Sequence, residues 1–208
     1  MIFNVLRDLA FLQRLFALDA EWALEVRGAG CPFCGGSLDD GSYLRKARGW
    51  LCDAPEWLFV RFSWCCRVEG CRKRVMPASV RFLGRKVYLS ASIVLSEVFV
   101  HGITPRRVCA LKKIFGVDRR TVSEWRRWWL ESFRSSPFWR SRRGLLPPDL
   151  DEGDLPYSLW SSFVGSEREK LLCVLRFLRP LTVSGGYVSL WAPSVRKGRS
   201  WTGRSVLG

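Results

Sequence analysis

Histidine and acidic side chains are scarce in this chain of 208 residues. It holds one histidine, His101, and 19 Asp and Glu against 34 Lys and Arg, a formal net charge of +15. Long apolar runs are missing too, because the longest, residues 87–100, contains Glu97 and three serines. The first scarcity excludes a metal centre built on several imidazoles, and the interrupted run excludes a helical membrane span. The basic surplus favours a polyanionic partner.

The N-terminal segment lacks the marks of a secretory signal. Arg7, Asp8, Arg14 and Asp19 interrupt its apolar residues, and no small-residue cleavage site follows. We therefore expect a cytoplasmic protein. In a reducing compartment its eight cysteines would bind metal or pack in the core rather than form disulfides.

The basic surplus lies in the middle of the chain. Residues 31–90 hold 11 basic and 5 acidic side chains, and residues 91–144 hold 12 and 4. The flanking segments, 1–30 and 145–208, carry only −1 and +2. A polyanion would therefore bind the two central segments.

Four cysteines form two pairs about thirty residues apart. Cys31 and Cys34 enclose two residues and precede a Gly-Gly pair, and Cys66 and Cys71 enclose four. Zn²⁺ takes four thiolates in a tetrahedron, and a Cys-x-x-Cys turn supplies two of them from one bend. Cys65 is an alternative third ligand, although it would point to the opposite face of a strand. The spacing predicts a structural zinc ribbon, since four protein ligands leave no position open for catalytic water.

The other cysteines, Cys52, Cys109 and Cys173, are predicted to be small buried apolar residues. A redox-active Cys31–Cys34 pair would require a helix start there, which the Gly-Gly pair disfavours.

Three helical stretches at short spacing predict a helix-turn-helix. They cover residues 90–100, 104–116 and 118–133, and Thr104-Pro105 and Asp118 mark two helix starts. In the third, apolar residues at spacings of three and four would face inward: Val122, Trp125, Trp129 and Phe133. The outward side chains would read duplex DNA, and the two arginines at the start of the second helix would hold phosphates. The predicted DNA contacts are Arg106, Arg107, Arg119, Arg120, Ser123, Arg126 and Arg127.

The remaining segments complete an α+β, mostly α architecture. Residues 4–27 form an amphipathic helix closed by Gly28 and Gly30, and residues 166–178 form another that ends at Pro180. Residues 57–64 read as a strand, and residues 80–89 as a connector that holds a further short strand. The predicted domains are an N-terminal helix 1–30, zinc ribbon and connector 31–89, helix-turn-helix 90–144, helical extension 145–192 and basic tail 193–208.

These motifs resemble a known family. The runs CPFCGG, CCRVEGCRKR with MPASVRFLGRKVYL, and GITPRRVCALKKIFGVDRRTVSEWRRWW are similar to the N-terminal part of bacterial insertion-sequence transposases and their associated small proteins. The resemblance covers about residues 31–144. It implies a four-cysteine zinc ribbon followed by a helix-turn-helix that binds the terminal DNA of the element. The chain departs from the family pattern in its four-residue second knuckle and in having too few residues after 144 for a ribonuclease H-like catalytic domain.

We therefore expect a non-catalytic, zinc-dependent protein that binds double-stranded DNA, an accessory or regulatory subunit of a mobile element in the bacterial nucleoid. A transposase or another element-encoded protein would be its partner. One alternative is a divergent recombinase that cleaves strands with Mg²⁺ held by the acids of residues 149–154, which look like a solvated loop. Another is an RNA-binding or protein-interaction module in which the ribbon and the tryptophans form a docking surface, where Trp128 and Trp139 could stack on single-stranded bases.

Overall fold

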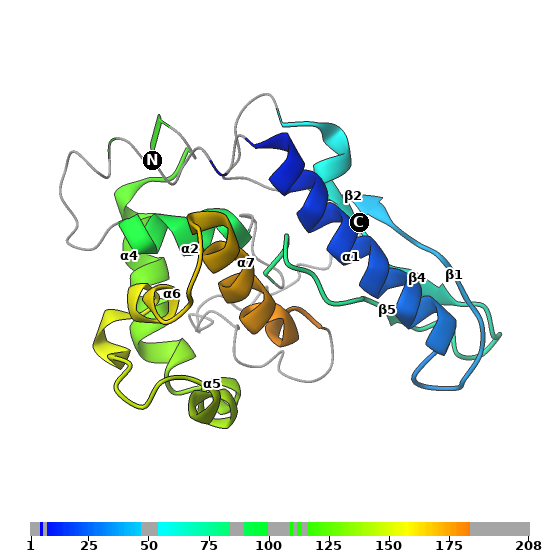
Figure 1. Cartoon of the computed structure of the whole chain (residues 1–208). Helices are drawn as coiled ribbons and strands as arrows, with labels where there is room; N and C mark the ends of the chain where they lie inside the picture. Colours follow the sequence, from blue (N-terminus) through cyan, green and yellow to red (C-terminus); the bar gives the residue numbers. More distant parts are fainter. Residues whose placement is uncertain are drawn as a thin grey trace, which may run out of the picture.

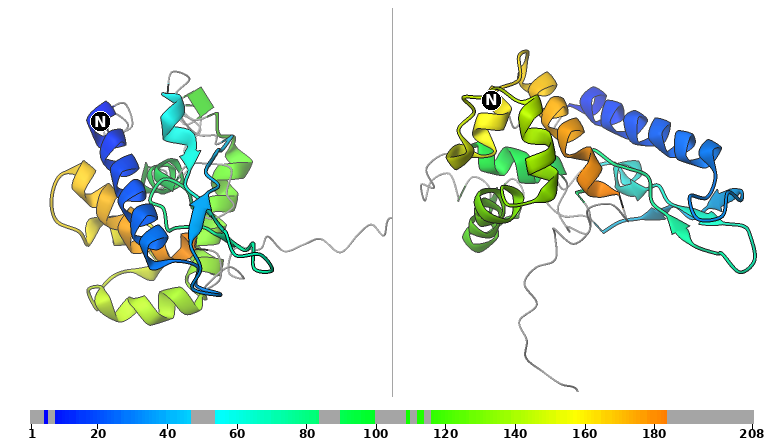
Figure 2. Two further views of the ribbon diagram at one scale, coloured as in Figure 1. Left: turned by 90° about the vertical axis from the view of Figure 1, so that its right-hand side faces the viewer. Right: turned by 90° about the horizontal axis from the view of Figure 1, so that it is seen from below.

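The chain folds into a helical body and a small β arm that share one long helix. The computed structural model describes residues 5, 8–46, 54–83, 90–99, 109, 112–113 and 116–183, with the backbone alone for 95–99. Helix α1 (Leu9–Ala29) runs from the body along the arm (Figures 1 and 2). Most of the buried residues form one cluster in the body, and a second cluster joins the arm to α1. The predicted mostly helical α+β class is confirmed.

Helix α1 begins at Leu9, later than the predicted start at residue 4. The Asp8 side chain accepts the amide N–H of Ala10 at 3.1 Å, and the helix ends at Gly30, whose φ is 78°. Gly28 lies inside the helix rather than closing it. Leu12 and Leu15 are buried and Leu9 is 52% exposed, whereas the charged Asp19 is completely buried.

The arm is built from short antiparallel strands. Strands β1 (Leu38–Asp40), β4 (Trp64–Cys66) and β5 (Arg74–Val75) form a sheet in the order β1-β4-β5, and β2 (Tyr43–Leu44) pairs with β3 (Val60–Arg61). In the register, Leu38 lies opposite Cys66, and Trp64 opposite Val75.

The strand predicted over residues 57–64 is interrupted. A 3₁₀ turn, η2 (Glu56–Phe59), precedes β3, and β4 follows after two residues. Leu58 and Trp64 would share one face of a continuous strand. In the structure Leu58 packs in the body and Trp64 in the arm cluster, so the chain must turn between them. Within described residues 80–83 only Phe82 makes an isolated bridge.

Helices α2 (Ser90–Phe99), α4 (Arg119–Arg127), α6 (Tyr157–Ser161) and α7 (Glu167–Leu178) form the body, and α2 contacts the other three. As predicted, Asp118 caps α4, and Ser166 caps α7 in a capping box with Glu169. The cap of α7 was not predicted, although its residue range was. The predicted 118–133 helix continues as a wider π-type turn, η3 (Trp128–Phe133). This widening lets Trp128, Trp129 and Phe133 all face the core, with ring centroids 4.8–5.3 Å apart.

Short elements connect these helices. They are α5 (Pro137–Arg142), η4 (Arg143–Leu145), η5 (Glu152–Asp154) and, after α7, η6 (Arg179–Thr182). Where the structure describes the chain, no helix has the length and apolar character that a bilayer crossing requires.

A buried polar network ties α1 to the rest of the fold. Arg81 Nε donates to Asp19 Oδ2 at 2.8 Å, and Ser79 and the Val80 amide donate to the same carboxylate. The Arg81 guanidinium also donates to the carbonyls of Leu58 and Val60, at 2.7 and 2.8 Å. Burial lowers the pKa of Arg81, but the bonds to Asp19 favour its charged form.

Candidate metal centre and basic helix

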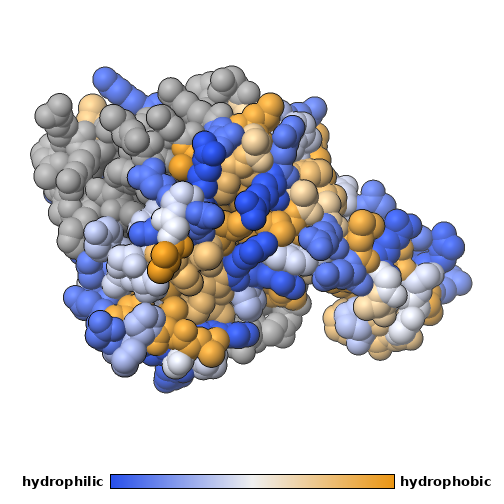
Figure 3. Space-filling view, in the orientation of Figure 1, coloured by the Kyte–Doolittle hydropathy of each residue, from blue (hydrophilic) through white to orange (hydrophobic). Residues whose placement is uncertain are grey.

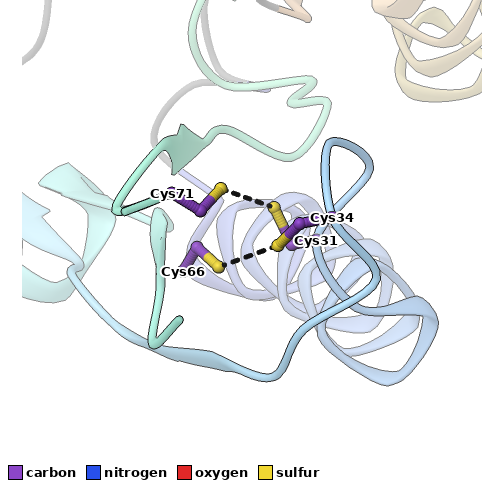
Figure 4. A group of neighbouring side chains, drawn as sticks. All are labelled: Cys31, Cys34, Cys66 and Cys71. Carbon is purple, nitrogen blue, oxygen red and sulfur yellow. Dashed lines mark hydrogen bonds between the residues drawn. The ribbon is translucent and has the colours of Figure 1, made fainter. Parts of the chain in front are cut away.

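Two knuckles at the end of the arm bring Cys31, Cys34, Cys66 and Cys71 together (Figure 4). Two backbone hydrogen bonds close the first knuckle: Gly35 N–H donates to Cys31 O, and Cys31 N–H to Gly36 O, both at 2.8 Å. Gly35 has a φ of 73°, a conformation that glycine adopts without strain. The predicted bend therefore forms as its sequence indicates.

The second knuckle accommodates its longer spacing with a turn. Cys71 N–H donates to Val68 O at 3.1 Å, and Gly70 has a φ of 86°. Cys66 N–H donates to Lys73 O at 3.0 Å, which holds the two sides of the loop together. The turn formed by the four intervening residues therefore places Cys71 next to Cys66.

The sulfur positions fit a tetrahedral metal ion. The Sγ atoms of Cys31 and Cys71 are 3.8 Å apart, those of Cys34 and Cys66 are 3.4 Å apart, and all four lie within 4.8 Å of one another. A tetrahedron with metal–sulfur bonds of about 2.3 Å has edges of about 3.8 Å. Four thiols at this spacing can hold one metal ion.

The thiols of Cys31 and Cys66 have pKa values shifted in opposite directions. For Cys31, burial disfavours the thiolate, but hydrogen bonds from the Phe33 and Cys34 amides and from neighbouring thiols lower its pKa to about 7. For Cys66, burial raises the pKa to about 12. Four negative charges at this spacing repel one another, and a bound cation would offset that repulsion.

Close packing fixes the distance between the knuckles. A Cβ atom added to Gly36 would collide with a methyl group of Val68, so a larger residue here would force the Val68 side chain to move. Trp64 Nε1–H donates to Ala23 O at 2.9 Å, which fastens the arm to α1. The sequence marked Gly36 only by its position after Cys-x-x-Cys. Its close approach to Val68 depends on the tertiary structure.

The remaining cysteines lie outside this group. Cys65 is the cross-strand neighbour of Asp39, and its Sγ lies 3.9 Å from Arg72 O. Cys109 is exposed, which corrects the prediction that it is buried, and Cys173 is half-buried. Position 109 has no place in the described core, so a cysteine there contributes no apolar packing. Cys52 falls outside the described residues.

Helix α4 has a buried face and a basic face. Val122, Trp125 and Trp129 are buried as predicted. The other face carries the predicted DNA contacts: Arg119, Arg120 and Arg127 are exposed, and Ser123 and Arg126 are half-buried. Arg120 Nε forms an exposed ion pair with Glu124 at 3.2 Å. Predicted contacts Arg106 and Arg107 lie outside the described residues.

Two acids of residues 149–154 have structural roles. Glu152 pairs with Arg143 at 3.0 Å and with Arg134 at 3.5 Å, and the Asp151 side chain caps η5. In the part of the chain that the structure describes, only the four cysteines form a group that could hold a metal ion. Asp149 and Asp154 belong to no such group.

The tryptophans of the second alternative are packed inside the molecule. Trp128 is 9% exposed and Trp139 only 2%. Their rings are therefore not available to stack on bases in this conformation.

No protein-family model, curated protein or solved structure matches the chain. The resemblance to insertion-sequence transposases therefore stays a prediction that rests on the quoted motifs.

Proposed function

We propose that this is a zinc-stabilised, non-catalytic protein that binds double-stranded DNA. The proposal is carried by α4, which buries Val122 and Trp125 in the core and presents Arg119, Arg120 and Arg127 to solvent. A helix fits the major groove of B-DNA, which is about 12 Å wide, and arginine bonds guanine O6 and N7 with both arms of its guanidinium.

The ion pair of Arg120 does not oppose this role. Its side chain is 78% exposed and that of Glu124 56%, so water screens their attraction. Such surface pairs contribute no more than about 1 kcal/mol. Arg120 can exchange Glu124 for a base or a phosphate at little cost.

Zinc is the metal we propose for the four cysteines. Four thiolates without an open position are typical of structural zinc, and soft sulfur ligands select against Mg²⁺ and Ca²⁺. In this role the ion holds the arm to α1 and takes no part in a reaction. The wider role, as an accessory protein of a mobile element, follows from the resemblance of residues 31–144.

The test is binding to duplex DNA that flanks the protein's own gene, in about 150 mM salt, against scrambled duplex. Arg120→Ala and Arg126→Ala should each weaken the specific complex by about 1–3 kcal/mol for a lost base contact. Arg168→Ala is the matched control, because Arg168 lies in the first turn of α7, outside α4, and pairs with Asp8. Equal affinity for flanking and scrambled duplex would reject sequence-specific reading, and preference for single-stranded RNA would reject DNA as the ligand.

A further inference from the structure

A cleft lies where the C-terminal ends of α5 and α7 meet. Its volume is about 420 Å³, within the range of small-molecule sites. Arg142, in the last turn of α5, lines one side, and Arg176 and Arg179, one turn apart, line the other. Ala78 and Phe177 are among its apolar lining residues.

The charged side chains that line this cleft in the structure are all arginines. Among the residues that the structure describes, no acidic side chain lines it and none of its three arginines forms an ion pair. By contrast, Arg134 and Arg143 in the same region both pair with Glu152. Three guanidinium groups around one hollow repel each other until an anion enters.

The fold holds the walls of the cleft in place. The Phe177 ring packs against those of Phe138 and Trp139, at 5.4 and 6.3 Å between centroids, and so joins α7 to α5. The Arg179 guanidinium lies 4.0 Å from the centre of the Trp22 ring. Beside Ala78, Ser79 N–H donates to Thr182 Oγ1 at 2.9 Å, which links the cleft to the network around Asp19.

Helix dipoles alone do not explain these arginines. A cation near the C-terminus of a helix is favourable, but α5 already carries Arg140 in its last turn, outside the cleft. Arg142 adds a second cation on the side that faces Arg176 and Arg179.

We propose that this cleft binds a phosphate group. Guanidinium matches phosphate oxygens with paired hydrogen bonds, and three such groups suit the charge of a phosphoryl or phosphodiester group. The phosphate belongs either to a nucleic-acid backbone or to a small phosphorylated ligand. The inference goes beyond the proposed function, since the cleft shares no residue with α4.

Calorimetry with pyrophosphate, at matched ionic strength in sodium chloride, tests the site. The wild type should bind, and Arg142→Gln with Arg176→Gln should weaken binding about tenfold for each charge-assisted bond lost. Arg140→Gln is the control, because it removes the same charge from the same helix turn. Arg176→Lys should retain part of the affinity, and circular dichroism should show each variant to be folded.

Absence of pyrophosphate binding by the wild type would overturn the proposal, and so would equal binding by the double variant. If the double variant loses pyrophosphate binding, its affinity for a short duplex DNA shows whether the site takes a backbone phosphate or a small phosphorylated ligand. A parallel loss of duplex affinity assigns the site to backbone phosphate, and unchanged duplex affinity assigns it to a small phosphorylated ligand. Arg120→Ala should leave pyrophosphate binding intact, so failure of the DNA-reading proposal would be seen separately.

Discussion

At the scale of single residues, the buried carboxylate of Asp19 links α1 to residues 79–81. The carboxylate accepts from Ser79, Val80 and Arg81, and the Arg81 side chain is 1% exposed. Moving two charges out of water is unfavourable, and these hydrogen bonds offset the cost only while both partners remain. Removal of either would leave the other buried and uncompensated.

Asp19→Ala should therefore lower the free energy of unfolding by about 3–5 kcal/mol. Glu124→Ala, which removes an exposed partner of Arg120, should lower it by less than about 1 kcal/mol. Urea titration followed by circular dichroism measures both. Similar small losses in the two variants would show that the Asp19–Arg81 pair does not anchor α1.

Two neighbouring cysteines test which thiols hold the metal. Cys66 belongs to the four-cysteine group and Cys65 does not. Cys66→Ser should lose the bound metal because one of four ligands is gone, whereas Cys65→Ser should keep one zinc ion per chain. Elemental analysis of purified protein gives the answer, and metal retention by Cys66→Ser would contradict the proposed site.

At the scale of elements, two glycines near the end of α1 have opposite roles. Gly28 lies within the helix with open space where a Cβ would be, and Gly30 ends the helix with a φ of 78°. A Cβ on Gly30 would also approach the Gly35 carbonyl oxygen to 3.1 Å.

Gly28→Ala should stabilise the protein by about 0.5–1 kcal/mol, because alanine loses less backbone freedom on folding. Gly30→Ala should destabilise it, because the left-handed backbone strains any residue with a Cβ. Thermal unfolding of the two variants provides the comparison. Destabilisation by Gly28→Ala would indicate that the helix ends before residue 28.

At the scale of the whole molecule, the arm and the body differ in what holds them together. The body has an extensive apolar cluster, whereas the buried members of the arm cluster are Ala23, Cys31, Leu38, Trp64 and Cys66. The arm forms a lobe set apart from the body in the space-filling view (Figure 3). We expect so small a core to depend on the proposed metal ion to stay folded.

Removal of the metal with a strong chelator should unfold the arm and leave the body folded. Hydrogen exchange should speed up for the amides of β1, β4 and β5, whereas α7 should keep its protection. The metal-loaded protein serves as the control. Loss of protection in α7 at the same rate would show that arm and body unfold as one unit.

Local signals predicted the parts of this protein that depend on neighbours in sequence. Asp118 caps α4, α7 lies within the predicted range 166–178, and the faces of α4 follow its apolar spacing. The break after Leu58 could not be predicted, because Leu58 and Trp64 pack in different clusters. The cleft arginines were missed too, since Arg142 meets Arg176 only when α5 packs on α7.

By itself, the sequence determined the two cysteine pairs, the start of α4 at Asp118 and the basic middle of the chain, because each depends on residues within a few positions or on composition. Only the tertiary structure decided that Asp19 pairs with Arg81, 62 positions away, and that Cys66 rather than Cys65 faces Cys34. Burial of a charge and convergence of thiols depend on which distant segment lies opposite, and no local pattern specifies that segment.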